Sequence, residues 1–197
     1  MLSHGPRSRR PLIPRHSPLE SIDPCFNSVK WPGFSTADIL AAVRMRDKSG
    51  LSAVAEGVCQ TMRSGYEILN QEASPGVFGN SEPPEGIDLE AFGAAVYRST
   101  GGTKLPPGIG CSKLKLTSNR AIKQALGKNF WPGFRAAFPG ARGLATFSLP
   151  GYSEDGSIAI VIVEMSCDTR CGGGEVWELH KSEEGWSVTK KIPAWIS

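Results

Sequence analysis

The last fifty residues of this chain constrain its fold more than any other segment, because apolar side chains recur there with the spacing of β-strands. Alternation with a period of two residues is typical of a strand with one buried face. A short run that is apolar at every position is typical of a strand buried on both faces. The four segments that show these patterns are residues 144–149, 157–165, 175–181 and 186–192. The second segment contains such a run, residues 158–163, so we expect residues 157–165 to be a central strand covered on both sides, with helices on one face.

The connections between these segments carry the residues that tight turns need. Two of them are Glu154-Asp155-Gly156 and Glu183-Glu184-Gly185, whose glycines can adopt the positive φ of short hairpin loops. In the fourth segment, Trp186, Val188 and Ile192 are expected to point inward, and Ser187, Thr189 and Lys191 outward. The pattern predicts a four-stranded antiparallel meander over residues 144–196.

Residues 35–138 have mostly helical spacing. Apolar residues recur at helical intervals in residues 39–43 and again from Leu51 to Leu69, with Ser49-Gly50 breaking the run between them. Asp88 is placed to cap a short helix that carries Leu89, Phe92 and Val96. Further on, residues 114–116 suggest a short strand, followed by a cap at Thr117 or Ser118 and a helix closed by Gly127. The tetrapeptide Trp-Pro-Gly-Phe occurs at residues 31–34 and 131–134, which we interpret as aromatic anchors at loop-to-helix junctions.

These segments predict an α+β fold in which N-terminal helices pack on a C-terminal four-stranded antiparallel meander, cystatin-like or nuclear-transport-factor-like in outline. We expect one domain over residues 25–197, with the helical part at 35–138 and the meander at 144–196. Residues 1–24 contain five prolines and no apolar run, which predicts a disordered, basic arm. Its arginines are not followed by the apolar region of a signal peptide, so no export signal is predicted there, and no segment of the chain has the length and apolarity of a transmembrane helix.

The formal charge of +3 comes from that arm. Four arginines lie in the first fifteen residues, and the rest of the chain carries 18 basic and 19 acidic residues. A folded part with balanced charge is not expected to bind nucleic acid through electrostatics.

The order of motifs in the last third is similar to that of a family of uncharacterised bacterial proteins. The motifs are Phe138-Pro139-Gly140 followed by Gly143, the pair Cys167 and Cys171-Gly172, Lys181 followed by Gly185-Trp186, and the terminal Trp195-Ile196-Ser197. Many members of that family are exported or lipid-anchored. The resemblance therefore implies an extracytoplasmic location, whereas the missing signal peptide leaves a cytoplasmic location as the alternative.

The segment 167–174 is the candidate site. Cys167 and Cys171 flank the turn between two predicted strands and are close enough for a disulfide, given the oxidising compartment that the resemblance implies. A disulfide that closes so short a loop stabilises the fold by only about 2 kcal/mol, so the role of this disulfide would be to hold the shape of the loop. The candidate binding residues are Asp168, Thr169, Arg170, Gly172, Gly173 and Gly174, of which the glycines would relieve backbone strain.

No residue set in the sequence predicts catalysis, a metal or a cofactor. His180 is interpreted as a solvent-facing strand residue beside Glu178, and Cys59 as a small thiol on a helix. The cysteines and His180 lack the spacing of a zinc site. We therefore expect a non-catalytic module that binds an unknown protein or small ligand. The alternative is a thiol-dependent enzyme or redox sensor that uses Cys167 or Cys171.

Overall fold

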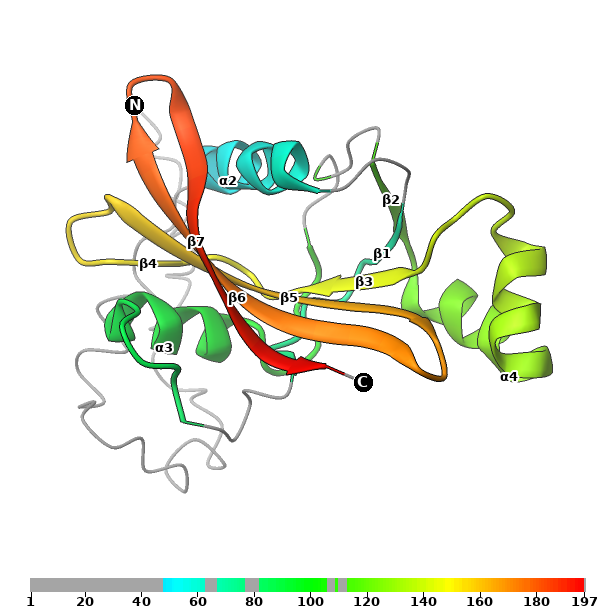
Figure 1. Ribbon diagram of the computed structural model, residues 1–197. Coiled ribbons are helices and arrows are strands. Elements are labelled where there is room, and N and C mark those ends of the chain that lie inside the picture. Colours follow the sequence, from blue (N-terminus) through cyan, green and yellow to red (C-terminus); the bar gives the residue numbers. More distant parts are fainter. Residues whose placement is uncertain (1–47, 63–66, 77–81, 106–108, 110–112, 197) are drawn as a thin grey trace, which may run out of the picture. The chain divides into compact units, whose positions relative to one another are not determined.

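The computed structural model describes residues 48–62, 67–76, 82–105, 109 and 113–196, all of which belong to one compact unit (Figure 1). The predicted arm at residues 1–24 and the first predicted helix at residues 39–43 lie outside these ranges. Among the helices in the described part, none is long and apolar enough to cross a bilayer.

The fold is α+β, but its sheet is larger than predicted. In the described residues it has seven strands, six of them in the order β2-β1-β3-β5-β6-β7, while β4 pairs with β5 beyond the end of β3. The strands are β1 (Glu67–Asn70), β2 (Leu114–Thr117), β3 (Leu144–Phe147), β4 (Gly151–Tyr152), β5 (Ile158–Asp168), β6 (Cys171–Ser182) and β7 (Gly185–Ile196). The prediction of a four-stranded meander was wrong, because β1 and β2 extend the sheet beside β3 and run parallel to it. The four predicted strands are β3, β5, β6 and β7, which do pair consecutively and antiparallel.

The helices are not confined to the N-terminal side of the strands. Strands β1 and β2 alternate with α2 (Lys48–Thr61), α3 (Leu89–Arg98) and α4 (Asn119–Ala137). Leu69, predicted as the last apolar residue of a helix, lies fully buried in β1. Ser49 and Gly50 do not interrupt a helix either, since α2 begins at Lys48. Apolar spacing alone could not separate the end of α2 from the short strand that follows it.

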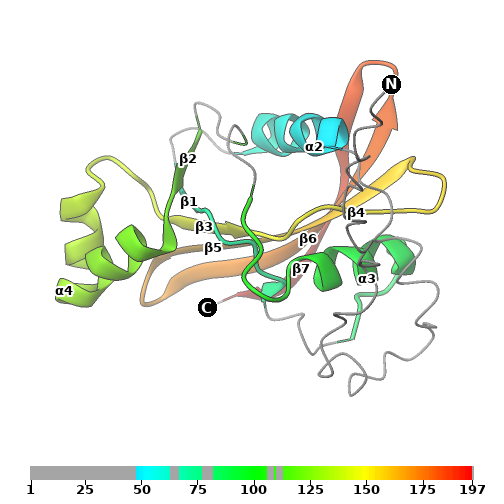
Figure 2. The same cartoon turned by 180° about the vertical axis from the view of Figure 1, so that it is seen from behind.

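Helices cover both faces of the sheet, not one. Figures 1 and 2 show α2 and α3 on opposite sides of β5 and β6. On the α2 face, Val54 and Val58 belong to a cluster that includes Val161, Trp177 and Leu179. The prediction that the central strand is buried on both faces is confirmed, since residues 159–163 are all buried.

Helix α3 begins as predicted and packs closely against β4. Asp88 is its N-cap, and the carboxylate accepts a hydrogen bond from the Ala91 amide at 2.8 Å. A Cβ at Gly151 of β4 would collide with the backbone of Ala91 and Ala95. The glycine therefore sets how closely this helix approaches the sheet.

Helix α4 also begins as predicted, at the N-cap Ser118, but it does not end at Gly127. It continues to Ala137 across a kink at Asn129 and Phe130, where Phe130 has a φ of 51°. Trp131 and Phe134 follow this kink and are buried against Ile68 of β1, as aromatic anchors should be. The kink turns the second part of α4 so that its aromatic side chains reach the sheet.

Strand β7 contains two irregularities that change which side chains face α2. Between Val188 and Lys190, one extra residue, Thr189, has no cross-strand counterpart in the register with β6. Such a bulge shifts the alternation of faces beyond it. Lys191, predicted to point outward, is consequently paired with Trp177 and places its Nζ 3.9 Å from the centre of that indole ring. Gly156 and Gly185 do have the positive φ predicted for their turns.

Candidate functional site

The candidate residues form the tip of the β5–β6 hairpin, which we call the disulfide tip and define as residues 167–174. Thr169 and Arg170 make the turn, and Asp168 pairs with Cys171. The side chains of Asp168, Thr169 and Arg170 are exposed, whereas burial increases along the three glycines to Gly174. The tip thus presents polar groups at the end of the hairpin.

A bulge in β5 lies at the first of the two cysteines. Ser166 pairs with Gly172 and Asp168 with Cys171, so Cys167 is an extra residue in the register of the β5–β6 ladder. The register of the hairpin body, continued past Ser166, would already place Cys167 opposite Cys171, so the two cysteines lie on adjacent strands at the same level of the hairpin. Their Cα atoms are 5.2 Å apart and their sulfur atoms are at disulfide distance.

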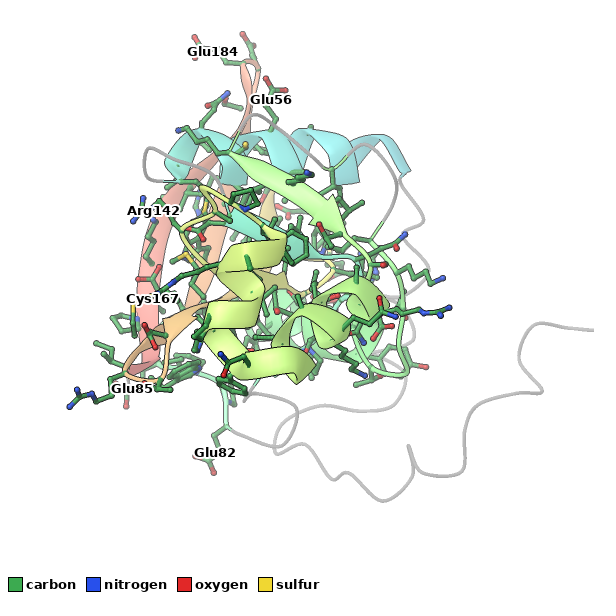
Figure 3. All side chains as sticks on the ribbon, turned by 90° about the vertical axis from the view of Figure 1, so that its right-hand side faces the viewer. Glu56, Glu82, Glu85, Arg142, Cys167 and Glu184 are labelled. Carbon is green, nitrogen blue, oxygen red and sulfur yellow. A yellow bond between two sulfur atoms is a disulfide. The ribbon has the colours of Figure 1, made fainter. Side chains whose placement is uncertain are left out.

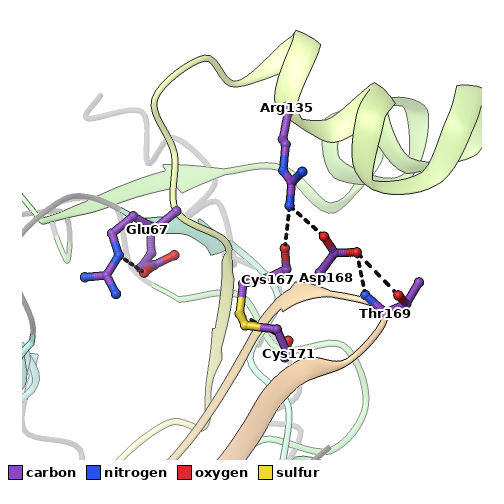
Figure 4. The surroundings of a disulfide bond; sticks show 7 residues. Glu67, Arg135, Cys167, Asp168, Thr169 and Cys171 are labelled. Carbon is purple, nitrogen blue, oxygen red and sulfur yellow. Dashed lines mark hydrogen bonds and ion pairs between the residues drawn. A yellow bond between two sulfur atoms is a disulfide. The ribbon is translucent and has the colours of Figure 1, made fainter.

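Helix α4 holds the disulfide tip through Arg135 (Figure 4). Arg135 Nη2 lies 2.7 Å from Asp168 Oδ2 and 3.4 Å from the carbonyl oxygen of Cys167. The Thr169 amide donates to the other carboxylate oxygen at 2.7 Å. The hydrogen bond from Thr169, and then that from Arg135, lower the pKa of Asp168. Because both ion-pair partners are exposed, this contact orients the loop more than it stabilises the fold.

Gly174 has a role that differs from the relief of strain that we predicted. It is buried, and the Trp195 indole of β7 lies directly over it, so a Cβ there would come within 3 Å of two indole atoms. Trp195 Nε1 donates to Glu164 Oε1 of β5 at 3.2 Å. The absence of a side chain at Gly174 therefore lets Trp195 reach across β6 to β5.

A partly buried carboxylate lies near the disulfide. Figure 4 shows Glu67 next to the pair, at the start of β1. Arg142 Nε is 3.8 Å from Glu67 Oε1, but burial outweighs this cation and raises the pKa of Glu67. A Cβ at Gly143 would collide with the Ser166 carbonyl and lie 3.2 Å from the Cα of Cys167. The glycine of this motif allows β3 to pack against the base of the tip.

The other candidate residues lie elsewhere. His180 Nε2 is 2.9 Å from Glu178 Oε1 on the exposed surface, which confirms its interpretation as a strand residue beside Glu178. It pairs with Ile158 and lies nine residues from Cys171 along β6, roughly 30 Å at the rise of a strand. Cys59 is buried on α2 and disulfide-bonded, so its interpretation as a thiol was wrong. Cys25 and Cys111 lie outside the described residues.

Arg135 and Trp195 were missed by the sequence analysis. Arg135 lies in the last turn of α4, 33 residues from Asp168, and no motif links the two positions. Trp195 was noted as part of a terminal motif, but its contact with Gly174 depends on a second irregularity in β7, at Ala194. Both contacts result from how distant segments pack together.

Comparisons with family models, with curated proteins and with solved structures each give no match.

The disulfide tip combines a constrained backbone with exposed polar groups. Its backbone is held by a short covalent loop and by Arg135, and its turn exposes an acid, a hydroxyl and a guanidinium. Neither cysteine lies at a helix N-terminus, where the helix dipole would favour a reactive thiolate. The arrangement therefore suits recognition of polar groups.

Proposed function

We propose that this protein is a non-catalytic, extracytoplasmic binding or structural module whose contact surface is the disulfide tip. The observation that carries the proposal is the pairing of Cys167 with Cys171 at an exposed hairpin end. Disulfides persist in oxidising compartments and are rare in the cytosol. The disulfide-bonded Cys59 on α2 supports the same environment.

The same proposal includes membership in the family of uncharacterised, often exported bacterial proteins that the motif order resembles. The motif glycines Gly140, Gly143 and Gly185 each occupy a place where a side chain would collide or the backbone would be strained. Such positions are a physical reason for a glycine motif. They support the resemblance by giving its residues a role in the fold.

The contacts around the pair favour binding over thiol chemistry. A reactive cysteine needs a positive neighbour or a base that stabilises its thiolate. Arg135 is directed to Asp168 and to the carbonyl of Cys167, and His180 lies near the opposite end of β6. Asp168, Thr169 and Arg170 would supply the polar contacts to a partner protein or small ligand.

The test is the redox state of the full-length protein, purified without reductant from an oxidising host compartment. We expect peptide mass spectrometry to find Cys167 bridged to Cys171, and iodoacetamide at neutral pH to leave both unmodified. The matched variant Cys171→Ser should free Cys167, which should then react no faster than an ordinary exposed thiol. Free thiols in the parent protein, one of them reacting far faster than that reference, would overturn the proposal in favour of a thiol enzyme or redox sensor.

A further inference from the structure

A polar row interrupts the apolar face of the sheet between α3 and α4. Ile68 of β1 and Leu144 of β3 pack beneath α4, and the next residues on the same face are Asn70 and Thr146. Thr146 pairs with Glu164 of β5, which follows the apolar run of that strand. Asn70, Thr146 and Glu164 therefore come from three adjacent strands and form one polar stripe.

A cleft of about 530 Å³ lies over this row. Its walls are residues 72–75, which follow β1, and residues 99–102, which follow α3. A volume of this size is within the range of small-molecule sites, roughly 300–1,000 Å³. Sequence analysis did not find the cleft, because its residues come from four separate segments.

Each carboxylate of the cleft accepts a hydrogen bond from a neutral donor. Trp195 Nε1 donates to Glu164, and Asn119 Nδ2 at the start of α4 donates to Glu72. An indole or an amide fixes the position of a carboxylate without supplying a positive charge. The backbone also comes close to Glu164 at Gly76, where a Cβ would collide with the carboxylate.

The lining consists mainly of hydrogen-bond acceptors. Within the described part of the chain it contains Glu72, Glu164, the Asn70 amide and several hydroxyls, and no lysine, arginine or histidine. A cleft lined by one sign of charge concentrates ions of the opposite sign. No group of three or more His, Cys, Asp or Glu side chains in the described ranges is arranged to hold a metal ion, which favours an organic cation.

We propose that this cleft binds a small organic cation that carries an ammonium group. An ammonium has three donors and no acceptor, which matches a lining of carboxylates, amide oxygen and hydroxyls. Charge-assisted hydrogen bonds to Glu164 and Glu72 would provide most of the affinity, and Asn70 and Thr146 would orient the ligand. This site is separate from the disulfide tip, so either proposal can fail without the other.

The experiment is isothermal titration calorimetry of the full chain at low ionic strength, with 1,3-diaminopropane, 1,4-diaminobutane and 1,5-diaminopentane as probes. We expect saturable 1:1 binding of at least one diamine and none of the uncharged 1,4-butanediol. Raising the salt concentration should weaken the binding, because screening reduces the attraction between charges. No saturable binding of any diamine, equally tight binding of butanediol, or displacement of the diamine by equimolar calcium chloride would overturn the proposal.

Variants locate the site. Glu164→Gln and Glu72→Gln should each weaken diamine binding by about tenfold or more, since each removes one charge-assisted contact. The control Glu154→Gln, in the exposed β4–β5 turn, should leave the affinity unchanged. Equal weakening by the control would show a general effect of surface charge and would contradict a site in the cleft.

Glu164→Gln could weaken binding by disturbing the contact with Trp195, so a third variant tests the site without changing Glu164. Thr146→Lys places an ammonium group of the protein next to Glu164, because the two residues are cross-strand partners. We expect this variant to keep the parent melting temperature and circular dichroism and to lose diamine binding. A folded Thr146→Lys variant that binds diamine as tightly as the parent would overturn the proposal.

Discussion

The two ends of strand β6 are closed by different means. At one end, Ser182 and Gly185 close the β6–β7 hairpin with a short turn in which Gly185 has a φ of 117°. At the other, the disulfide tip uses a bulge, a covalent loop and an ion pair to α4. Figure 3 shows Glu184 at the first of these ends and Cys167 at the other.

The comparison shows what the disulfide contributes. A positive-φ glycine and a hydrogen bond from Ser182 Oγ to the Gly185 carbonyl close the β6–β7 hairpin, so a hairpin in this sheet does not need a covalent link. Three features restrict the conformation of the disulfide tip: the cysteine pair, the contact with Arg135, and the packing of Trp195 over Gly174. We infer that the disulfide holds the shape of this one exposed loop and is not needed to form the hairpin.

The two largest effects, equal in expected size, come from Gly174→Ala and from removal of the disulfide. A methyl group at residue 174 would overlap Trp195, and overpacking of this kind costs about 2 kcal/mol of folding free energy. Chemical denaturation of the oxidised protein would measure the loss. In a Trp195→Ala background the same substitution should cost much less, and an equal cost in both backgrounds would contradict the assigned contact.

The double variant Cys167→Ser/Cys171→Ser should lower the stability by about 2 kcal/mol, the loop-closure contribution of so short a ring. Hydrogen exchange followed by mass spectrometry should show faster exchange in residues 168–174 and unchanged exchange at the β6–β7 turn. Acceleration at both ends of β6 would mean that the disulfide supports the whole hairpin.

Gly185→Ala should destabilise the opposite end by about 1 kcal/mol, because the residue has a positive φ that alanine adopts only with strain. Gly127→Ala is the matched control. It lies in α4 with no atom within 4 Å of the added methyl, so it should be neutral or stabilising by about 0.5–1 kcal/mol. Thermal melts of the two variants measure the difference.

Arg135→Ala should change the electrostatics of the disulfide tip with little effect on the fold. Removing the guanidinium should raise the pKa of Asp168 toward its ordinary value, while the hydrogen bond from Thr169 keeps it partly lowered. NMR titration of the Asp168 carboxyl carbon would measure this shift. Arg120→Ala, on the exposed first turn of the same helix, should leave that pKa unchanged.

A third hairpin turn extends the comparison to pH. Hydrogen bonds from Ser153 and Ser157 lower the pKa of Asp155 to about 2, from an ordinary value of 3.8. A lowered pKa in the folded state means that the contribution of Asp155 to stability is present above pH 3.8 and is lost as the pH falls toward 2. The Asp155→Asn variant should lack this part of the acid dependence in denaturant titrations between those pH values, whereas Glu154→Gln should retain it.

The features that the sequence predicted correctly depend on neighbouring residues. Asp88 and Ser118 cap their helices because a short polar side chain reaches an amide three residues ahead. Gly156 and Gly185 form turns because only glycine adopts a positive φ without strain. The apolar run of β5 indicates a central strand because burial on both faces requires it.

The features that were missed depend on pairing between distant segments. Nothing in the four residues of β1 shows that they lie parallel to both β2 and β3, and the helical spacing before them favoured a helix. The bulges at Cys167 and Thr189 shift the faces of β5 and β7, which moves Lys191 onto Trp177. A period of two residues cannot reveal an extra residue in a ladder whose partner strand is unknown.

The sequence by itself determined the antiparallel strands β3, β5, β6 and β7, the turns β4–β5 and β6–β7, and the caps of α3 and α4, because local backbone preferences and hydrophobic periodicity encode them. The tertiary structure alone decided the contact of Arg135 with Asp168, the cover of Trp195 over Gly174 and the polar row at Glu164. Each of these requires side chains that are far apart in the chain, and their meeting depends on strand order and register.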